Sequence, residues 1–241
     1  MSDGIYVALS GAIAQTESLD TTATNLANAS TDGYQRVRAV FREALATATG
    51  GAGARSVTNS GVSLDTTRGV LRATGNALDV VLPDQSYLAV GTTRGERYTR
   101  AGALAVGSDG TLNTSRGDPL VGDDGKPIRA TKDQGPVKIA ASGEVWQGDT
   151  KLGRLRIVAF SSPDRLVPEG GTLLNATAAA GTPTVAKGEL SIGTLEGSNT
   201  SVVGAMTDLV TASRAFDAFQ KALDAFQQAD HKVVTTVPGD S

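Results

Sequence analysis

The chain lacks cysteine altogether and has a single histidine among its 241 residues. Without cysteine, a disulfide scaffold, a thiolate metal site and a cysteine nucleophile are all excluded. One histidine excludes a histidine-rich metal centre and argues against a Ser–His–Asp triad. That histidine, His231, lies near the end of the last predicted helix, where the helix dipole favours a cation. The composition thus removes the commonest thiol and imidazole chemistries.

Strong charge of one sign and long apolar runs are also lacking. The net charge of −3 is spread without long runs, so the chain has no basic footprint for nucleic acid. No apolar run approaches the roughly 20 residues that span a bilayer. The N-terminal MSDGIYVALSGAIAQ begins acidic and its apolar positions are interrupted, unlike a secretory signal peptide. Taken alone, these features predict a cytoplasmic protein or one exported by a route that leaves no cleaved signal.

The most regular stretch is C-terminal, residues 198–237, and it contains no proline. Apolar or small residues recur there three or four apart, as on one face of a helix. About 35 residues at 1.5 Å each predict a helix roughly 50 Å long, with its first turn capped by Ser198 or Asn199. The stripe comprises Val202, Met206, Leu209, Ser213, Phe216, Phe219, Leu223, Phe226 and Val233.

A second amphipathic helix is predicted at the other end, over residues 4–28. Its apolar positions step by four and three in alternation, as in the seam of a heptad repeat. The seam is rich in small residues, so at about 25 cal/mol per Å² the helix alone would be marginal in water. Either it packs on its own domain, or it pairs with the C-terminal helix and both project from the middle of the chain. The seam comprises Ile5, Leu9, Ala12, Thr16, Leu19, Ala23 and Leu26.

Between the helices the pattern changes to short alternating runs. Residues 36–68 are expected to be an extended or loop connector, with a glycine-rich flexible loop at 48–56. Over 69–187, short strand-like runs are separated by turn sequences such as GSDG (107–110) and GDDG (122–125). This punctuation predicts an antiparallel β domain, because βαβ units would need helical segments between the strands. Residues 188–241 then return to the C-terminal helix.

No constellation in this middle region predicts catalysis. Asp109, Asp123, Asp124 and Asp149 lie in turns, where such residues ordinarily stabilise the turn itself. The polar run 98–100 is predicted to be exposed on a strand. We therefore predict no enzyme, no cofactor and no metal. A soluble carbohydrate-binding or hydrolytic β domain stays as an alternative, and it would need a polar pocket with a charge pair.

Motifs at both ends and in the middle resemble one known family. The first helix closes with Leu26-Ala27-Asn28, followed by Thr31-Asp32-Gly33-Tyr34. Further likeness lies in GVLRATGNALDVVL (69–82), YTRAGALAVGSDGTL (98–112), GDPLVGDDGKPI (117–128) and LEGSNTSVVGAMTDLVTASRAFDAF (195–219). In this order, over nearly the whole chain, they resemble the bacterial flagellar basal-body rod proteins. One departure is the PDQSYL of 83–88, where the family usually has a glycine followed by two aromatics.

The resemblance implies an α+β fold in which long N- and C-terminal α-helices form a coiled-coil domain, with a central antiparallel all-β domain inserted between them. It implies a proximal rod subunit that assembles helically with copies of itself and other flagellar rod proteins, transmits torque and lines the export channel. The chain would leave the cell through the flagellar type III export apparatus, without a cleaved signal, and reside in the rod crossing the periplasm. It implies no nucleic acid and no small-molecule substrate. A distal rod or hook-type axial protein is the alternative.

An assembly interface is expected along the two helices. Its predicted residues are Ile5, Leu9, Ala12, Leu19, Ala23, Leu26, Val202, Met206, Leu209, Ser213, Phe216, Phe219, Leu223 and Phe226.

Overall fold

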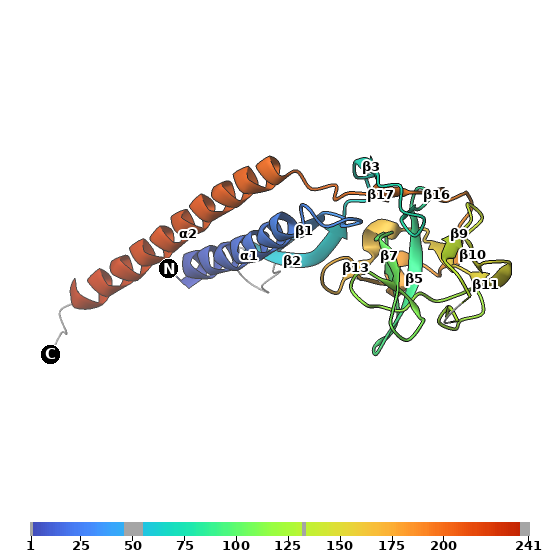
Figure 1. Cartoon of the computed structure of the whole chain (residues 1–241). Helices are drawn as coiled ribbons and strands as arrows, with labels where there is room; N and C mark the ends of the chain where they lie inside the picture. Colours follow the sequence, from blue (N-terminus) through green and yellow to red (C-terminus); the bar gives the residue numbers. More distant parts are fainter. Residues whose placement is uncertain (1, 46–54, 132–133, 237–241) are drawn as a thin grey trace. The chain divides into compact units, whose positions relative to one another are not determined.

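A computed structural model describes residues 2–45, 55–131 and 134–236 (Figure 1). The chain divides into two compact units. The first, which we call the helical unit, holds the described parts of Met1–Leu26, Arg38–Val62 and Val202–Ser241. The second, the β unit, holds Ala27–Val37 and Ser63–Ser201. Most of the predicted 48–56 loop lies outside the described residues.

Two α-helices dominate the helical unit: α1 spans Ser2–Ala27 and α2 spans Val202–Thr236. Gln15 of α1 donates a hydrogen bond from Nε2 to the Ala212 carbonyl of α2, at 3.0 Å. A Cβ placed on Gly11 would lie 2.6 Å from Cε1 of Phe219, so the ring fits only because Gly11 has no side chain. These two contacts run in opposite sequence directions, which makes the helices antiparallel. Strands β1 (Val37–Leu45) and β2 (Arg55–Leu64) pair with each other.

The predicted coiled-coil domain is wrong. A coiled coil buries its seam positions between the helices, whereas Leu9, Thr16 and Ala23 of the α1 seam are exposed. The same holds for Val202, Met206 and Ser213 of α2. The described contacts between the two helices join a small residue to a larger one, Ala212 to Gln15 and Gly11 to Phe219. Large apolar residues such as Leu9 and Met206 therefore stay outside the contact instead of interlocking as knobs. The fold is α+β, with two α-helices in the described residues and an antiparallel β domain between them.

The β unit contains short antiparallel strands arranged in several sheets. The largest has six strands in the order β13-β14-β6-β5-β12-β15, and a second has the order β11-β10-β9. Two-stranded pairs β16-β4, β17-β3 and β7-β8 complete the unit. The bounds are β3 Leu71–Ala73, β4 Val80–Val81, β5 Ser86–Thr92, β6 Gly95–Thr99, β7 Leu104–Val106, β8 Leu112–Thr114, β9 Val137–Ile139, β10 Glu144–Gln147, β11 Thr150–Arg154, β12 Ile157–Ala159, β13 Val167–Pro168, β14 Leu174–Asn175, β15 Thr184–Val185, β16 Ser191–Ile192 and β17 Thr194–Glu196, with 3-10 turns at Pro163–Arg165 and Ala178–Ala180.

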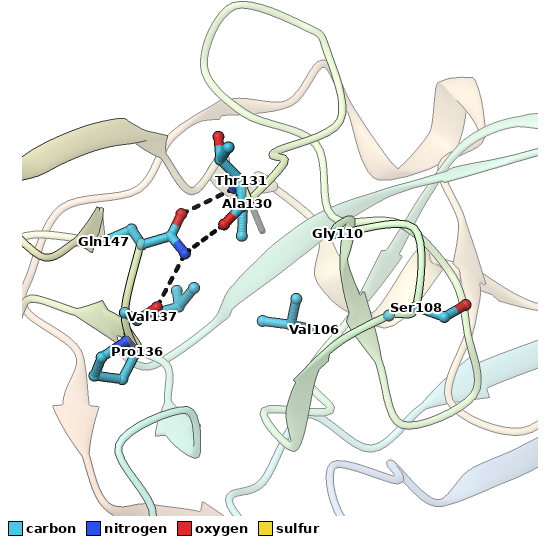
Figure 2. Close-up of a pocket in the computed structure, with 10 residues that line it drawn as sticks. Val106, Ser108, Gly110, Ala130, Thr131, Pro136, Val137 and Gln147 are labelled. Carbon is cyan, nitrogen blue, oxygen red and sulfur yellow. Dashed lines mark hydrogen bonds between the residues drawn. The ribbon is translucent and has the colours of Figure 1, made fainter. Parts of the chain in front are cut away.

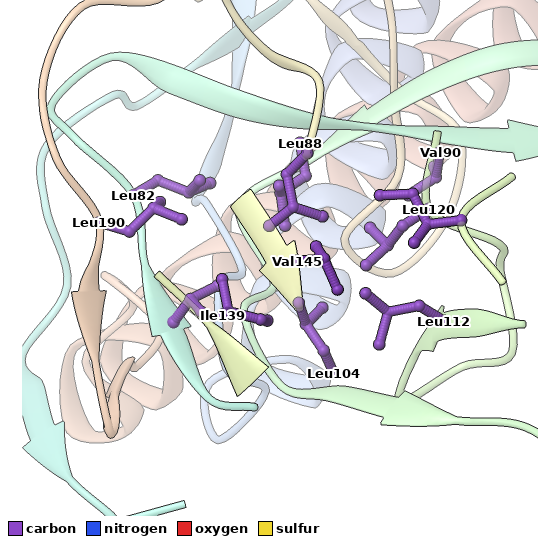
Figure 3. Close-up of a cluster of buried hydrophobic side chains, with 12 residues drawn as sticks. Leu82, Leu88, Val90, Leu104, Leu112, Leu120, Ile139, Val145 and Leu190 are labelled. Carbon is purple, nitrogen blue, oxygen red and sulfur yellow. The ribbon is translucent and has the colours of Figure 1, made fainter. Parts of the chain in front are cut away.

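One aliphatic core holds these small sheets together (Figure 3). Alternation along β5 sends Leu88 and Val90 into this core, where they meet Val145 of β10 and other leucines and valines. Tyr87, the residue before Leu88, joins a separate aromatic cluster around Phe160, with the two ring centroids 6.0 Å apart. No α-helix within the described ranges is long and apolar enough to cross a bilayer.

The departure at 83–88 folds into a tight turn that leads into β5. Ser86 donates hydrogen bonds from N and Oγ to the Pro83 carbonyl, at 3.3 and 2.6 Å. Both Tyr87 and Leu88 are fully buried, so this segment packs into the β unit without the two aromatic residues. Gln85 at the turn has φ +52°, the single positive φ among the described non-glycine residues. A side chain in this left-handed region is strained.

We expect Gln85→Gly to stabilise the protein by about 0.5–1 kcal/mol, because glycine removes the left-handed strain at an exposed turn. Thermal unfolding should show this as a Tm rise of about 2 °C. Ser108→Gly is the matched control: Ser108 is exposed in another turn and has no positive φ, so glycine there only adds entropy to the unfolded chain. A lower Tm for Gln85→Gly would contradict the strain.

Candidate functional site

The predicted interface residues of α1 fall into two groups. Ala12 is buried, and Leu19 and Leu26 are half-buried. Leu9 and Ala23 are exposed. The side chain of Ile5 lies outside the described residues. Burial along the predicted α1 interface is therefore uneven, and Leu9 and Ala23 are left exposed to solvent in the single chain.

The α2 stripe divides in the same way. Leu209, Phe216 and Leu223 are half-buried, whereas Val202, Met206, Ser213 and Phe219 are exposed, and the Phe226 side chain lies outside the described residues. The best-buried positions are Ala205 and Ala212, which the stripe does not include. The sequence signal that could have identified these two buried positions is a pair of alanines seven residues apart on one helix face, since small residues let helices approach closely. Apolar surface is thus left open on both helices, and such surface commonly marks an interaction site.

A second feature lies in the β unit, where the two helix-linking segments of the chain meet. We call it the junction, and define it by residues 33–36, 65–69, 83–87, 100 and 196–199. Gly33, from the motif after α1, donates its N–H to the Glu196 carbonyl at 2.7 Å. It has φ +73°, and a Cβ there would lie 2.4 Å from the Ala101 nitrogen, so only glycine fits.

Asn199 joins three segments of the junction. Its Oδ1 accepts from the Arg36 N–H at 2.6 Å, and its own N–H donates to the Tyr34 carbonyl at 3.3 Å. Its Nδ2 donates to the carbonyls of Asp65 and Thr67, at 2.8 and 2.9 Å. The predicted role of Asn199 as a helix cap is therefore wrong, because α2 begins three residues later and the side chain is engaged elsewhere.

A buried ion pair forms the centre of the junction. The Arg100 guanidinium donates two hydrogen bonds to the Glu196 carboxylate, from Nη2 to Oε2 at 2.5 Å and from Nε to Oε1 at 3.3 Å. Both side chains are almost fully buried, at 3% and 4% exposure. Glu196 also accepts from the Gly69 N–H at 3.2 Å, and Arg68 Nε lies 3.8 Å from it. Arg100 further donates to the Ser86 carbonyl at 2.9 Å.

The prediction that the 98–100 run is exposed is wrong, since Thr99 and Arg100 are buried. A polar run in an alternating strand gives no sign that its charge has a partner 96 residues away. The same holds for Glu196, which looks like a solvated residue in the sequence. Only the fold brings these charges together.

Beside the ion pair lie two buried polar atoms that make no hydrogen bond of good geometry among the described residues, Tyr87 Oη and Gln35 Oε1. The Gln35 side chain is nevertheless close enough to Tyr87 to act against the rise of its pKa. The Tyr87 ring faces the Arg100 guanidinium at 5.9 Å. Burial raises the pKa of Tyr87 to about 12, although the Arg100 charge opposes the rise. Burial also raises the pKa of Tyr98 to about 12, and the hydrogen bond to Glu96 adds to the rise.

A pocket of about 260 Å³ opens on the β unit between the segment 106–110 and the residues 130–131 and 135–137 (Figure 2). Gln147 closes one side, and its amide is fully engaged: Oε1 accepts from the Thr131 N–H, and Nε2 donates to the carbonyls of Thr131 and Gly135. The described lining carries no acidic or basic side chain. The charge pair that a hydrolytic site would need is absent from this lining.

The carboxylates of Asp109 and Asp124 accept hydrogen bonds from residues of their own turns. Asp109 accepts from Thr111 N and Oγ1, at 3.0 and 2.6 Å, and these hydrogen bonds lower the pKa of Asp109. Asp124 accepts from the Lys126 N–H at 3.0 Å. Among the described residues, no group of three or more acidic or histidine side chains could hold a metal ion.

Comparison with known proteins fits this pattern of two helices and a junction. A family model described as "Flagella basal body rod protein" matches residues 5–35, and one described as "Flagellar basal body rod FlgEFG protein C-terminal" matches residues 192–236. The rod protein FlgF of Caulobacter vibrioides is 30% identical over 203 residues, covering 83% of both chains. FlgF of Escherichia coli is 35% identical over 83% of this chain and 84% of its own. The chain belongs to the flagellar basal-body rod protein family. FlgG of Agrobacterium fabrum is 32% identical over 81% of this chain and 84% of its own.

Membership makes the chain a structural component of the flagellar rod, and the matched segments show which parts carry the family pattern. The first covers most of α1 and Gly33 to Gln35 of the junction. The second covers Glu196, Asn199 and all of α2. Most of α1, all of α2 and the two junction segments nearest the helices therefore lie within the parts that define rod proteins, whereas 65–69, 83–87 and Arg100 lie outside them.

The buried ion pair generates a stability prediction. Glu196→Gln should lower the free energy of unfolding by about 3 kcal/mol, because it leaves the buried Arg100 charge uncompensated. Glu144→Gln is the control, since Glu144 forms an exposed pair with Lys151 and its loss should barely change the denaturation midpoint. Urea denaturation of both variants measures the difference. Equal midpoints for the two variants would show that the buried pair contributes nothing special.

Two buried tyrosines that pack on Phe160, Tyr87 and Tyr98, give a matched comparison. Tyr87→Phe should be neutral or stabilising, because its hydroxyl makes no hydrogen bond of good geometry among the described residues, whereas Tyr98→Phe should cost about 1 kcal/mol by removing the 2.8 Å hydrogen bond to Glu96. A raised pKa means that the tyrosine stabilises the fold below pH 10 and that this contribution is lost as the pH rises to about 12. Tyr87→Phe should therefore lose less stability than the parent protein between pH 10 and 12. A larger cost for Tyr87→Phe than for Tyr98→Phe would contradict the assignment.

Proposed function

We propose that this chain is a subunit of the proximal rod that assembles helically through α1 and α2, with copies of itself and with other rod proteins. The observation that carries the proposal is the apolar surface on both helices. Val203 is 74% exposed, Met206 52% and Ile13 54% in the single chain. An isolated globular protein would bury such residues, and an assembling one buries them against its neighbours.

The junction supports a role in transmitting torque. A rod subunit has to pass force between its helices and the rest of its mass. The segment that follows α1 and the segment that precedes α2 are both fastened to the β unit by Glu196 and Asn199. A buried, bidentate ion pair resists displacement better than isolated surface contacts do. Load entering through either helix would therefore reach the same buried cluster.

We extend the proposal to the route of export. The chain leaves the cell through the flagellar type III export apparatus, without a cleaved signal, and comes to reside in the rod that crosses the periplasm. The thin contact between α1 and α2 supports this, because helices that bury little alone stay easy to unfold and become ordered on assembly. Small residues at Ser10, Ala14 and Gly204 would let helices of neighbouring subunits pack closely around a narrow export channel, whereas Gly11 and Ala12 are already used within the chain.

The likeness to FlgG favours a second candidate, a distal rod position. The two candidates use the same helices and differ in where the subunit sits along the axis. Labelling the protein in isolated basal bodies would separate them, because a proximal subunit is labelled near the motor end and a distal one near the hook.

The proposal predicts that Leu209→Asp abolishes incorporation into the rod. A buried carboxylate at this half-buried position of α2 opposes helix packing, while the β unit does not depend on it. Swimming in soft agar and blotting of purified basal bodies measure incorporation, and thermal unfolding checks that the β unit remains folded. Gln220→Asp is the control, because Gln220 is exposed on the same helix. Normal swimming of Leu209→Asp would overturn the proposal.

A further inference from the structure

The first turns of α2 carry a second apolar face that the predicted stripe misses. Val203, Met206 and Val210 lie within about 60° of one another on a helix that turns 100° per residue. They are well exposed, Val210 at 52%. Ala212, whose carbonyl accepts a hydrogen bond from Gln15 of α1, lies about 120° or more away round the helix from each of them. This face is therefore not covered by the packing of α1 on α2.

The face is short. Further along the same side of α2 come Arg214, Asp217 and Lys221, which are charged and exposed. An apolar partner can therefore cover Val203 to Val210 and no more. A patch with a defined end sets one register, whereas a continuous stripe would let a partner helix slide.

A matching apolar pair lies on α1. Leu9 and Ile13 are exposed, at 45% and 54%, and are one helical turn apart. Their spacing of four residues equals that of Met206 and Val210. On antiparallel helices, Ile13 can lie against Met206 while Leu9 lies against Val210.

These two patches cannot meet within one chain. The contacts of Gln15 with Ala212 and of Gly11 with Phe219 place Ile13 level with residues 215–216 of its own α2. Met206 is about ten residues away, which is roughly 15 Å along the helix. The two patches also lie on the outer sides of their helices. Each patch needs a partner from another molecule.

We propose that the Val203–Met206–Val210 face of α2 receives Leu9 and Ile13 of α1 from a second copy of this chain, displaced by roughly 15 Å along the helices. The inference rests on the proposed function and names the partner of that surface. The two patches differ, so the contact is heterologous and propagates from copy to copy instead of closing into a dimer. It buries on the order of a few hundred Å², far below the roughly 1,000 Å² of a stable pair, so it forms only where the rod repeats it.

Cysteine cross-linking tests the contact directly, because the chain has no cysteine of its own. The double variant Ile13→Cys/Met206→Cys is expressed in place of the parent, basal bodies are isolated and mildly oxidised, and the products are separated without reductant. We expect bands at multiples of the chain mass. The control Ile13→Cys/Asp224→Cys places the second thiol on the same side of α2, beyond the apolar face, and should give monomer.

Three outcomes overturn the inference. A double variant that is present in basal bodies but gives only monomer, or gives as much cross-link in the control, shows that the two patches do not meet. A cross-link to a protein of another mass makes a different rod protein the occupant. The parent protein's absence from basal bodies would instead overturn the proposed function.

If the cysteine substitutions themselves prevent assembly, a pair of charge substitutions tests the same contact. Ile13→Glu and Met206→Lys should each abolish swimming, because each places an unpaired charge in the contact. Together they should restore it through an ion pair between copies. A double variant that swims no better than either single variant counts against the contact.

Discussion

The bidentate contact between Arg100 and Glu196 is the interaction on which the arrangement of the chain depends. It is buried in the β unit, yet one partner lies only six residues before α2 begins. Through the Glu196 backbone it also holds Gly33, six residues after α1 ends. Two chain segments 163 residues apart are thereby fixed side by side. The two helices do not need strong contacts with each other, because the segment after α1 and the segment before α2 are already fixed within the β unit.

Because the β unit fixes the ends of both helices, α1 and α2 can bury little surface against each other. The β unit has its own aliphatic core and its own polar centre, so its stability does not require α1 or α2 to bury much surface. The helices are free to keep apolar residues for contacts with other molecules. A tightly paired coiled coil within one chain would have consumed the same residues and left little for assembly.

Much of this organisation can be read from the sequence, and the failures have physical causes. Period and turn residues are local signals, so the helical segments at both ends and the antiparallel β region between them were predictable. The family likeness was predictable from motifs such as Thr31-Asp32-Gly33-Tyr34. The packing of the two helices was not predictable, and the coiled coil inferred for them is wrong, since heptad spacing describes a face of a helix without saying what covers that face. The junction was also missed, because the partners of Arg100, Glu196 and Asn199 are set by long-range contacts that leave no local pattern.

The unequal lengths of the two helices have a consequence of their own. Extending the register of Gln15 on Ala212, the start of α1 lies level with about residue 225 of α2. The last part of α2, to Thr236, then extends roughly 15 Å beyond the start of α1. In the proposed assembly, this extra length is available to a neighbouring subunit. Contacts between subunits would then end at different heights along the axis, and no single cross-section of the rod would pass between all of them.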